Sequence, residues 1–479
     1  MAVALPNDGN AASSPPDQSA KKAQGSAVER EKAASAGAAD MEQSAQRERF
    51  IPITRFALID RLTNPDAWPP GEARHVRRFF RYLDYWRQQQ YNAKLLSLEQ
   101  NYEPFSPDSD LLITRSYTDD ERSRLKRRVV DEIEYFLTQA NYTRVDPSRV
   151  EIILTRDSYY GLDLQVDLQA FEELLIYYRG ASARKDRRRT WRKFMLKQEF
   201  DVPIYRRLFV LFKLKTEAQR IEEVMRQRDI SQSQATRLVR GWRRMLPAEV
   251  SDRYIYMKLF KNIPRTDLEM IFPNTRVNFR LMDKLKLGIT GGAGFGVGAF
   301  GAAGKIALAA TNPIAAAGAI VGLAGICFRQ AMNFINQRQR YMIIMAQNLY
   351  FHAMADNRGV GIKLADRAAE EDVKEEMLLY AVLAKEQVNA RDLKAVDEAI
   401  EKYLLDTFGV TVDFDLDDAL GRLKAEGLVT EDRDGNLSAL PPAEAARHID
   451  RKWDVFLDDL PDLGAGEGTE AVDSSGIAA

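Results

Sequence analysis

Residues 287–304, LGITGGAGFGVGAFGAAG, are followed by Lys305 and then by residues 306–328, IALAATNPIAAAGAIVGLAGICF. These two runs contain 18 and 23 residues without a charged side chain. At a rise of about 1.5 Å per residue, helices of these lengths span roughly 27 and 35 Å, on either side of the ~30 Å hydrocarbon core of a bilayer. The sequence therefore predicts a two-helix transmembrane hairpin over residues 286–330.

The position of the turn in this hairpin is open. Asn-Pro within Thr311–Pro313 is a strong turn signal, because Pro is favoured at the first position of a following helix. A turn nearer Lys305 is the alternative. Lys286 precedes the hairpin and Arg329 follows it. The positive-inside rule then predicts a multi-pass protein of the cytoplasmic (inner) membrane, with the lipid bilayer as partner and both termini in the cytoplasm.

Glycines recur at helical spacing in both runs. Close backbone approach through such residues associates helices within a bilayer. We therefore expect the hairpin to pack on itself or to form a homo-oligomer through Gly288, Gly292, Gly296, Gly318 and Gly322. A Gly/Ala-rich hairpin buried in a soluble domain is the alternative interpretation.

The remaining sequence predicts a predominantly helical α+β protein. We expect disordered tails at residues 1–46 and 462–479, a cytosolic α+β domain at 47–285, and a helical, winged-helix-like domain at 331–461. In the first domain, periodicity predicts helices over Glu72–Asn101, Asp119–Ala140 and Thr216–Leu246. A small, mostly antiparallel sheet is predicted between them, with strands at Leu162–Leu168, Leu174–Tyr178, Lys193–Phe200 and Tyr205–Lys215.

The C-terminal part combines helices with one hairpin. A long helix from Asn333 is expected to end at Asn357–Gly359, and helices are expected over Asp366–Lys385 and Asp392–Phe408. Asp415 is the expected N-cap of a further helix, before a hairpin over residues 428–440. That helix carries more acidic than basic side chains, which favours an unknown protein partner over DNA for this acidic domain.

The net charge of −1 conceals two opposed parts. Residues 1–350 contain 55 Lys+Arg and 40 Asp+Glu, whereas residues 351–479 contain 14 and 30. Two basic clusters stand out in the first part. One is the run from Arg184 to Lys193, and the other consists of Arg237, Arg240, Arg243 and Arg244 around Trp242 on an expected helix. Such clusters fit anionic lipid headgroups or nucleic acid, and a solvated loop is the plain alternative for the first.

With a membrane hairpin in the same chain, lipid headgroups rank above nucleic acid as the partner of these clusters. The candidate headgroup contacts are Arg187, Arg188, Arg189, Arg192 and Lys193.

Signals for enzyme chemistry are weak. The chain has one Cys and three scattered His, so no metal site is expected. Residues 296–301 match G-x-G-x-x-G, but no acidic residue follows before Asp356 to bind a ribose, so no cofactor is expected. No catalytic residue is assigned, and a membrane-bound enzyme using sheet carboxylates near Asp163, Asp167 and Glu172 is kept as an alternative.

Several segments resemble the bacterial members of the transmembrane protein 143 family, a domain of unknown function. These are residues 47–52 (RERFIP), 171–180, 202–215 and, most distinctively, 256–275 (YMKLFKNIPRTDLEMIFPNT). The resemblance covers roughly residues 47–460. It implies membrane helices and supplies no catalytic residues.

The sequence thus predicts an integral membrane protein of unknown activity, acting as a non-enzymatic, membrane-tethered scaffold or protein-interaction module. Two alternatives remain: the membrane-bound enzyme, and a soluble or peripheral basic protein that binds anionic lipid or nucleic acid.

Overall fold

The computed structural model describes residues 47–110, 116–145, 162–189, 197–264, 271–273, 275–279 and 350–458, and residues 268, 325, 328, 329 and 332. The chain divides into two units, residues 1–48 and 49–479, and the elements described below belong to the second. Both predicted tails, residues 1–46 and 462–479, lie outside the described residues.

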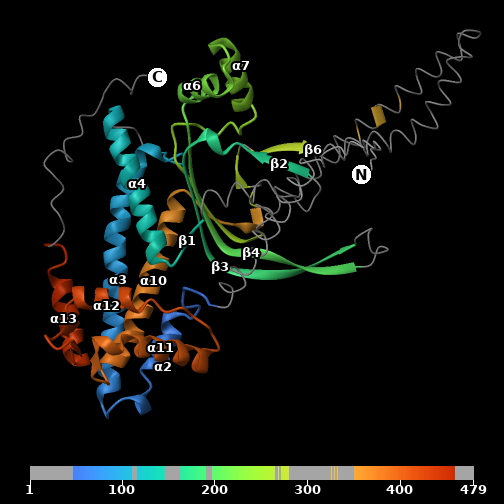
Figure 1. The fold of residues 1–479 in the computed structure, drawn as a ribbon. Helices are drawn as coiled ribbons and strands as arrows, with labels where there is room; N and C mark the ends of the chain where they lie inside the picture. Colours follow the sequence, from blue (N-terminus) through green and yellow to red (C-terminus); the bar gives the residue numbers. More distant parts are fainter. Residues whose placement is uncertain are drawn as a thin grey trace, which may run out of the picture. The chain divides into compact units, whose positions relative to one another are not determined.

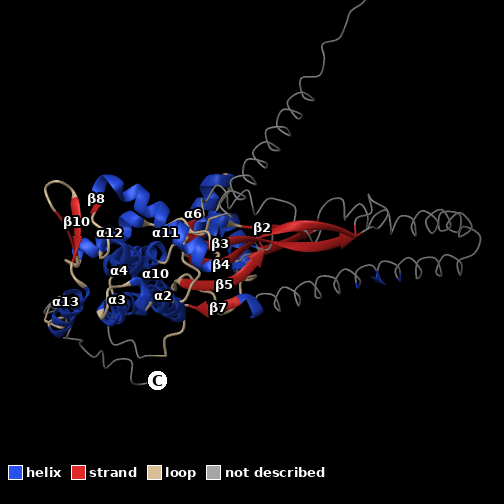
Figure 2. Cartoon of the chain, turned by 90° about the horizontal axis from the view of Figure 1, so that it is seen from below, coloured by secondary structure: helices blue, strands red, loops and turns tan. Residues whose placement is uncertain are grey.

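Three long helices form the centre of the helical part (Figures 1 and 2). They are α3 (Glu72–Tyr102), α4 (Asp119–Gln139) and α10 (Arg358–Leu383). The predictions over Glu72–Asn101 and Asp119–Ala140 are confirmed. Thr118 caps α4 in a capping box, in which the amide of Glu121 donates to Thr118 Oγ1 and the amide of Thr118 donates back to Glu121. Shorter elements precede or follow α3: α2 (Arg55–Leu62), η1 (Pro65–Ala67) and η2 (Glu103–Phe105).

An antiparallel sheet packs beside these helices, in the order β1-β3-β4-β5-β7. Its strands are β1 (Thr143–Arg144), β3 (Phe171–Arg189), β4 (Lys197–Leu214), β5 (Tyr256–Pro264) and β7 (Ala353–Asp356). A separate pair is formed by β2 (Leu162–Val166) and β6 (Thr275–Phe279), and η3 (Leu168–Ala170) leads into β3. The small antiparallel sheet predicted from alternation is therefore present.

The two central strands are longer than the sequence predicted. Lys193–Phe200 and Tyr205–Lys215 were expected as separate strands, but one strand, β4, covers the second half of the first and nearly all of the second. β3 continues through Gly180 to Arg189, whereas the expected strand ended at Tyr178. Beyond Ile204, where pairing with β5 ends, β3 and β4 pair only with each other and form a two-stranded ribbon (Figure 2).

The predicted helix over Thr216–Leu246 is two helices. α6 (Glu217–Arg228) and α7 (Gln232–Arg243) are separated by three residues, of which Asp229 adopts φ 49°. A left-handed residue ends the first helix, and Asp tolerates that conformation better than most side chains.

A second difference concerns the segment before α10. Asn357–Gly359 was expected to end a helix, but Asn357, with φ 45°, is the N-cap of α10, which starts at Arg358. The helix predicted over Asp366–Lys385 therefore begins two turns earlier.

The C-terminal elements follow the order α10, β8, α11, α12, β9, β10. A helix and a short strand thus come first, and two helices and a β-hairpin follow. This is the element order of a winged helix. β10 pairs antiparallel with both β8 and β9. The bounds are β8 (Val388–Asn389), η6 (Ala390–Asp392), α11 (Leu393–Phe408), α12 (Leu416–Ala425), β9 (Val429–Glu431), β10 (Asn436–Ala439) and α13 (Pro442–Asp454).

The largest hydrophobic core joins segments from both ends of the sequence. It contains Phe79 and Phe80 of α3, Tyr380 of α10 and Leu423 of α12, all of which are fully buried. The Tyr380 ring is tilted against that of Phe79 and edge-on to that of Phe80, with ring centroids 4.4 and 6.0 Å away. Two further cores lie on either side of the sheet, one against α3, α4 and α10, the other around Phe212, Tyr256 and Phe272.

The membrane prediction is wrong. Among the described residues, no helix combines the length and the apolar character that crossing a bilayer requires. The longest one, α3, has 31 residues but carries charges throughout, including Arg77, Asp84 and Lys94. This finding overturns the membrane fold class and the multi-pass location in the cytoplasmic membrane. The predicted hairpin itself, residues 286–330, lies outside the described residues apart from residues 325, 328 and 329.

Candidate functional site

The predicted packing and headgroup residues are only partly within the structure. The five glycines, Gly288, Gly292, Gly296, Gly318 and Gly322, lie outside the described residues, as do Arg192 and Lys193. Arg187, Arg188 and Arg189 belong to strand β3 and not to a loop. Their register partners on β4 are Glu199, Gln198 and Lys197, so an acidic position stands opposite one of the three arginines.

The carboxylates proposed for an enzyme do not form one site. Asp163 lies on β2 in register with Asn278. Asp167 pairs with Arg220 at 2.7 Å, whereas Glu172 pairs with Lys126 at 2.6 Å and also contacts Lys213. Burial alone raises the pKa of Glu172, but the hydrogen bonds from the two lysines outweigh it, and the net pKa lies below its usual value. Glu172 is therefore an ion-pair partner of two lysines, which favour its ionised form.

The three histidines lie in separate places. His75 is exposed on α3, His352 Nδ1 is 2.7 Å from the carbonyl oxygen of Lys261, and His448 Nε2 is 2.8 Å from that of Glu426. The single cysteine, Cys327, and the G-x-G-x-x-G match at residues 296–301 lie outside the described residues.

The second basic cluster falls on the α6–α7 hairpin, which is inserted between β4 and β5 and extends past the end of the sheet (Figure 1). The hairpin has its own small core, in which Val224, Ala235 and Val239 are buried and Leu238 and Trp242 are partly buried. The first helix, a three-residue turn with left-handed Asp229, and the second helix form a helix-turn-helix arrangement.

Both helices of this hairpin are capped by their own side chains. The amide of Thr216 donates to Gln219 Oε1 at 3.0 Å at the start of α6. At the start of α7, the amide of Ser231 donates to Gln234 Oε1 at 3.4 Å. These caps fix where α7 begins and therefore which of its residues face outward.

The base of the hairpin is attached to the sheet by ion pairs and hydrogen bonds. Arg220 pairs with Asp167, and its guanidinium carbon lies 5.6 Å from the ring centroid of Trp242. Arg243 donates to the carbonyl of Lys215 at 2.8 Å and to Asp252 at 2.9 Å. Arg220 and Arg243 are thus used to hold the hairpin in place.

The outward face of α7 is basic. At 100° per residue, the side opposite the buried Ala235 and Val239 carries Ser233, Arg237, Arg240, Gly241 and Arg244. All five are exposed. Arg240 pairs with Glu217 at 2.9 Å with both side chains solvent-accessible, which is a weak interaction. Arg237 and Arg244 have no ion-pair partner among the described residues.

A separate group of charges lies where α10 meets α3, α12 and strand β3. We call it the buried charge cluster; all its members are buried except Arg422, which is partly buried, and it consists of Arg87, Arg179, Glu371, Asp372, Lys374, Glu375, Glu376 and Arg422. Arg87 Nη2 lies 2.7 Å from Glu376 Oε1, and Arg422 Nη2 lies 2.5 Å from Glu375 Oε2. Since every charge has an opposite partner, burial of the group is tolerated, although such pairs are weak evidence for stability.

Two carboxyls of this cluster have strongly raised pKa values. Burial raises the pKa of Asp372 to about 7, although Arg422 opposes the rise. Burial also raises the pKa of Glu375 to about 8, again against the effect of Arg422. Near neutral pH these two groups are therefore partly protonated, and the hydroxyl of Tyr91 donates to Asp372 at 2.6 Å.

Two members of this cluster, Asp372 and Glu375, form with the adjacent Asp418 of α12 the one candidate metal-ligand group within the described residues, and their carboxylate oxygens lie within 4.8 Å of one another. Arg422 contacts all three carboxylates, at 3.3 Å from Asp372 Oδ1 and 2.5 Å from Glu375 Oε2. Its guanidinium already supplies the positive charge that a cation would bring, so the donor set does not call for a metal.

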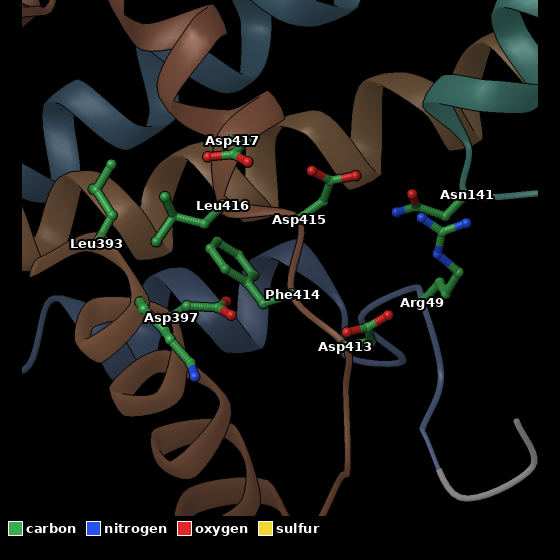
Figure 3. Close-up of a pocket in the computed structure, with 10 residues that line it drawn as sticks. Arg49, Asn141, Leu393, Asp397, Asp413, Phe414, Asp415, Leu416 and Asp417 are labelled. Carbon is green, nitrogen blue, oxygen red and sulfur yellow. The ribbon is translucent and has the colours of Figure 1, made fainter. Parts of the chain in front are cut away.

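An acidic pocket of about 410 Å³ lies at the start of α11 and α12 (Figure 3). Leu393, Phe414 and Leu416 form its apolar part. Its polar lining comes from Arg49, Asn141, Lys394, Asp397, Asp413, Asp415 and Asp417. The neighbouring carboxylates and burial raise the pKa of Asp397, with burial the larger effect. The exposed side of α12 and this pocket are therefore negative, which opposes contact with phosphates.

Sequence reasoning located the basic helix but missed the buried charge cluster. Residues 370–376, EEDVKEE, fall within the helix predicted over Asp366–Lys385, and the sequence assigned no partners to their charges. The one available signal was that charges occupy every face of a helix whose following residues, MLLYAVL, are apolar on every face.

A family model described as a protein of unknown function (DUF3754) matches residues 171–359. The matched range includes β3, β4, β5 and the whole α6–α7 hairpin. This supports the expected domain of unknown function, and nothing links the chain to the transmembrane protein 143 family. No solved structure matches the chain.

Proposed function

We propose that the protein binds nucleic acid through the outward face of α7. The observation that carries this proposal is the alignment of Arg237, Arg240 and Arg244 on the exposed side of the second helix of a helix-turn-helix arrangement. Lys and Arg that neutralise phosphates supply most of the non-specific affinity for nucleic acid. In helix-turn-helix proteins, the second helix is the one that approaches the bases.

An anionic lipid surface offers similar phosphate chemistry, but α7 suits it less well. A helix that lies in a membrane interface inserts a broad apolar face. The apolar residues of α7, Ala235, Leu238 and Val239, instead pack against α6. The preference for lipid over nucleic acid also depended on the predicted membrane hairpin, which is corrected above.

The binding face is assigned to α7 and not to the winged-helix-like part. α12 exposes Asp417 and Asp418, and the adjacent hairpin exposes Glu431, Asp432 and Asp434. These charges repel phosphates. An unknown protein partner for this acidic part is a separate proposal, which its charge favours. A scaffold role without a membrane tether is compatible with both, and kinship with the transmembrane protein 143 family stays a proposal resting on residues 256–275.

The experiment compares two double variants of the full chain for binding to a fluorescein-labelled DNA duplex, measured by anisotropy. Arg237→Ala/Arg244→Ala removes two exposed arginines seven residues apart on α7. Arg74→Ala/Arg81→Ala is the matched control, because it removes two exposed arginines seven residues apart on α3. We expect the first variant to weaken binding about tenfold or more and the control to bind as the unchanged protein does.

Two results would contradict the proposal. One is equal affinity of both variants, since the phosphates would then be bound elsewhere. The other is binding to vesicles of phosphatidylserine with no binding to the duplex, which would assign the arginines to lipid.

A further inference from the structure

One residue on the outward face of α7 has no structural reason to be where it is. Gly241 lies in the last turn but within the helix, and a Gly there costs about 1 kcal/mol relative to Ala. Its backbone is not left-handed, and no atom lies within 4 Å of the position that a Cβ would occupy. The described fold therefore accepts Ala, or a larger residue, at this position.

The neighbours of Gly241 indicate what its missing side chain allows. Arg237, Arg240 and Arg244 surround it on the same exposed face. A glycine without internal cause permits another molecule to approach the backbone closely. Because three cations surround the gap, the approaching molecule is anionic.

The width of α7 can be compared with the widths of the grooves of duplex nucleic acids. An α-helix with its side chains is about 10–12 Å across, and the major groove of B-form DNA is about 12 Å wide. The DNA minor groove, at about 6 Å, is too narrow for a helix. The major groove of duplex RNA is deep and narrow, so side chains do not read it. Of these three grooves, only the DNA major groove therefore accommodates α7.

We propose that α7 lies in the major groove of duplex DNA, with Gly241 at the point of closest approach to the DNA. This inference rests on the proposed function and narrows its ligand from nucleic acid to B-form DNA. Ser233 and Arg237, in the N-terminal half of α7, face the base edges, as the corresponding residues of recognition helices do. Arg237 suits guanine, whose O6 and N7 accept a bidentate arginine. Arg240 and Arg244 contact phosphates on the groove wall.

The test uses the full chain and two labelled duplexes of the same sequence, one DNA and one RNA, each of about two dozen base pairs or roughly two helical turns. The variants are Gly241→Ala and Gly241→Leu. Gly421→Leu is the matched control, because Gly421 is also an exposed glycine within a helix, with no atom within 4 Å of its Cβ position.

We expect DNA to bind at least about tenfold more tightly than RNA at about 0.1 M salt. Gly241→Leu should weaken DNA binding about tenfold and leave RNA binding unchanged, and Gly421→Leu should change neither. Gly241→Ala should reduce DNA affinity less than Leu does. Since both substitutions favour the helix, circular dichroism should report unchanged or higher helicity, and loss of binding then reflects the interface and not unfolding.

Two outcomes overturn the inference and are distinguishable from each other. If DNA and RNA bind equally and Arg237→Ala/Arg244→Ala weakens both, α7 binds phosphates without entering the groove, and the proposed function stands alone. If neither duplex binds at low salt, the proposed function and the inference both fail.

Discussion

Arg422 of α12 donates from Nε to Oε1 of Glu376 on α10 at 3.0 Å, and Glu376 is fully buried. The same carboxylate receives Arg87 of α3, so one side chain joins three helices. Residues 87, 376 and 422 come from distant parts of the sequence. The pair therefore holds the C-terminal winged-helix-like elements against the N-terminal helices, in addition to their shared hydrophobic core.

Arg422→Met tests this relationship. Removal of the guanidinium leaves Glu376 with Arg87 alone and leaves Glu375 and Asp372 without their main opposite charge. Loss of one partner from a buried ion pair costs about 3–5 kcal/mol. We expect a loss of that size in the free energy of unfolding, measured by urea denaturation. Arg433→Met, at an exposed position of the β9–β10 turn, should change the free energy by less than about 0.5 kcal/mol. If both variants changed the free energy of unfolding equally, the ion pairs of Arg422 would contribute nothing to stability.

The raised pKa values of Asp372 and Glu375 make stability depend on pH. In the folded protein these carboxyls have pKa values of about 7 and about 8, against ordinary values of 3.8 and 4.5. Between about pH 5 and 8 the folded chain therefore holds protons that the unfolded chain releases, and stability falls as pH rises. The slope reaches at most roughly 1.4 kcal/mol per pH unit for each group.

The matched variant is Asp372→Asn/Glu375→Gln, which keeps the shape of both side chains and removes their titration. Its free energy of unfolding should change less between pH 5 and 8 than that of the unchanged protein. Groups with a lowered pKa, such as Glu172 and Glu426, titrate below pH 5 and so do not contribute to the pH dependence between pH 5 and 8. A steeper or unchanged slope in the variant contradicts the assignment.

Asp229 tests the turn that orients α7. Its φ of 49° lies in the left-handed region, where Gly has no steric cost. Asp229→Gly should stabilise the hairpin by about 0.5–1 kcal/mol and leave DNA affinity unchanged. Asp229→Val should destabilise it by more and weaken binding. Hydrogen exchange of the α7 amides measures the change in stability, and anisotropy with the labelled duplex measures the change in affinity. Faster exchange in the Gly variant would argue against this turn geometry.

Tyr380 links α10 to the end of β10 by a single hydrogen bond. Its hydroxyl donates to the carbonyl of Leu440 at 2.6 Å. Tyr380→Phe keeps the aromatic contacts with Phe79 and Phe80 and should cost about 0.5–1.5 kcal/mol, because it removes a hydrogen bond to a partly buried carbonyl. Tyr85→Phe is the control at a position 58 % exposed. Equal midpoints of thermal unfolding for the two variants would contradict a stabilising role for this hydrogen bond.

Local signals predicted the helices well where the caps lie in the sequence. Thr118 and Glu121 mark the start of α4 within one residue. The division of residues 216–246 depended on one backbone angle at Asp229, for which an Asp in a helical pattern gives only a weak signal. Ser231, an ordinary N-cap residue, was the available cue for the start of α7.

Long-range pairing limited the rest. Nothing near Glu376 in the sequence reveals that Arg87 and Arg422 lie beside it, so the sequence predicted the helix at this point but not its buried ion pairs. The basic run at Arg184–Arg189 looked like a loop because alternation fades there, whereas its pairing with β4 extends the strand. The uncharged runs at 287–328 gave the strongest sequence signal and led to the membrane prediction, which the described helices do not support.

The salt dependence of duplex binding tests the central claim most directly. Each phosphate contact contributes about 0.9 to the slope of log K against log salt. If Arg237 and Arg244 each neutralise one phosphate, Arg237→Ala/Arg244→Ala lowers the magnitude of the slope by roughly 1.8; if Arg237 instead contacts an uncharged guanine edge, the slope falls by roughly 0.9, from Arg244 alone. Arg74→Ala/Arg81→Ala leaves it unchanged. A slope that stays the same in the α7 variant, or falls equally in the α3 control, would contradict nucleic-acid binding by the outward face of α7.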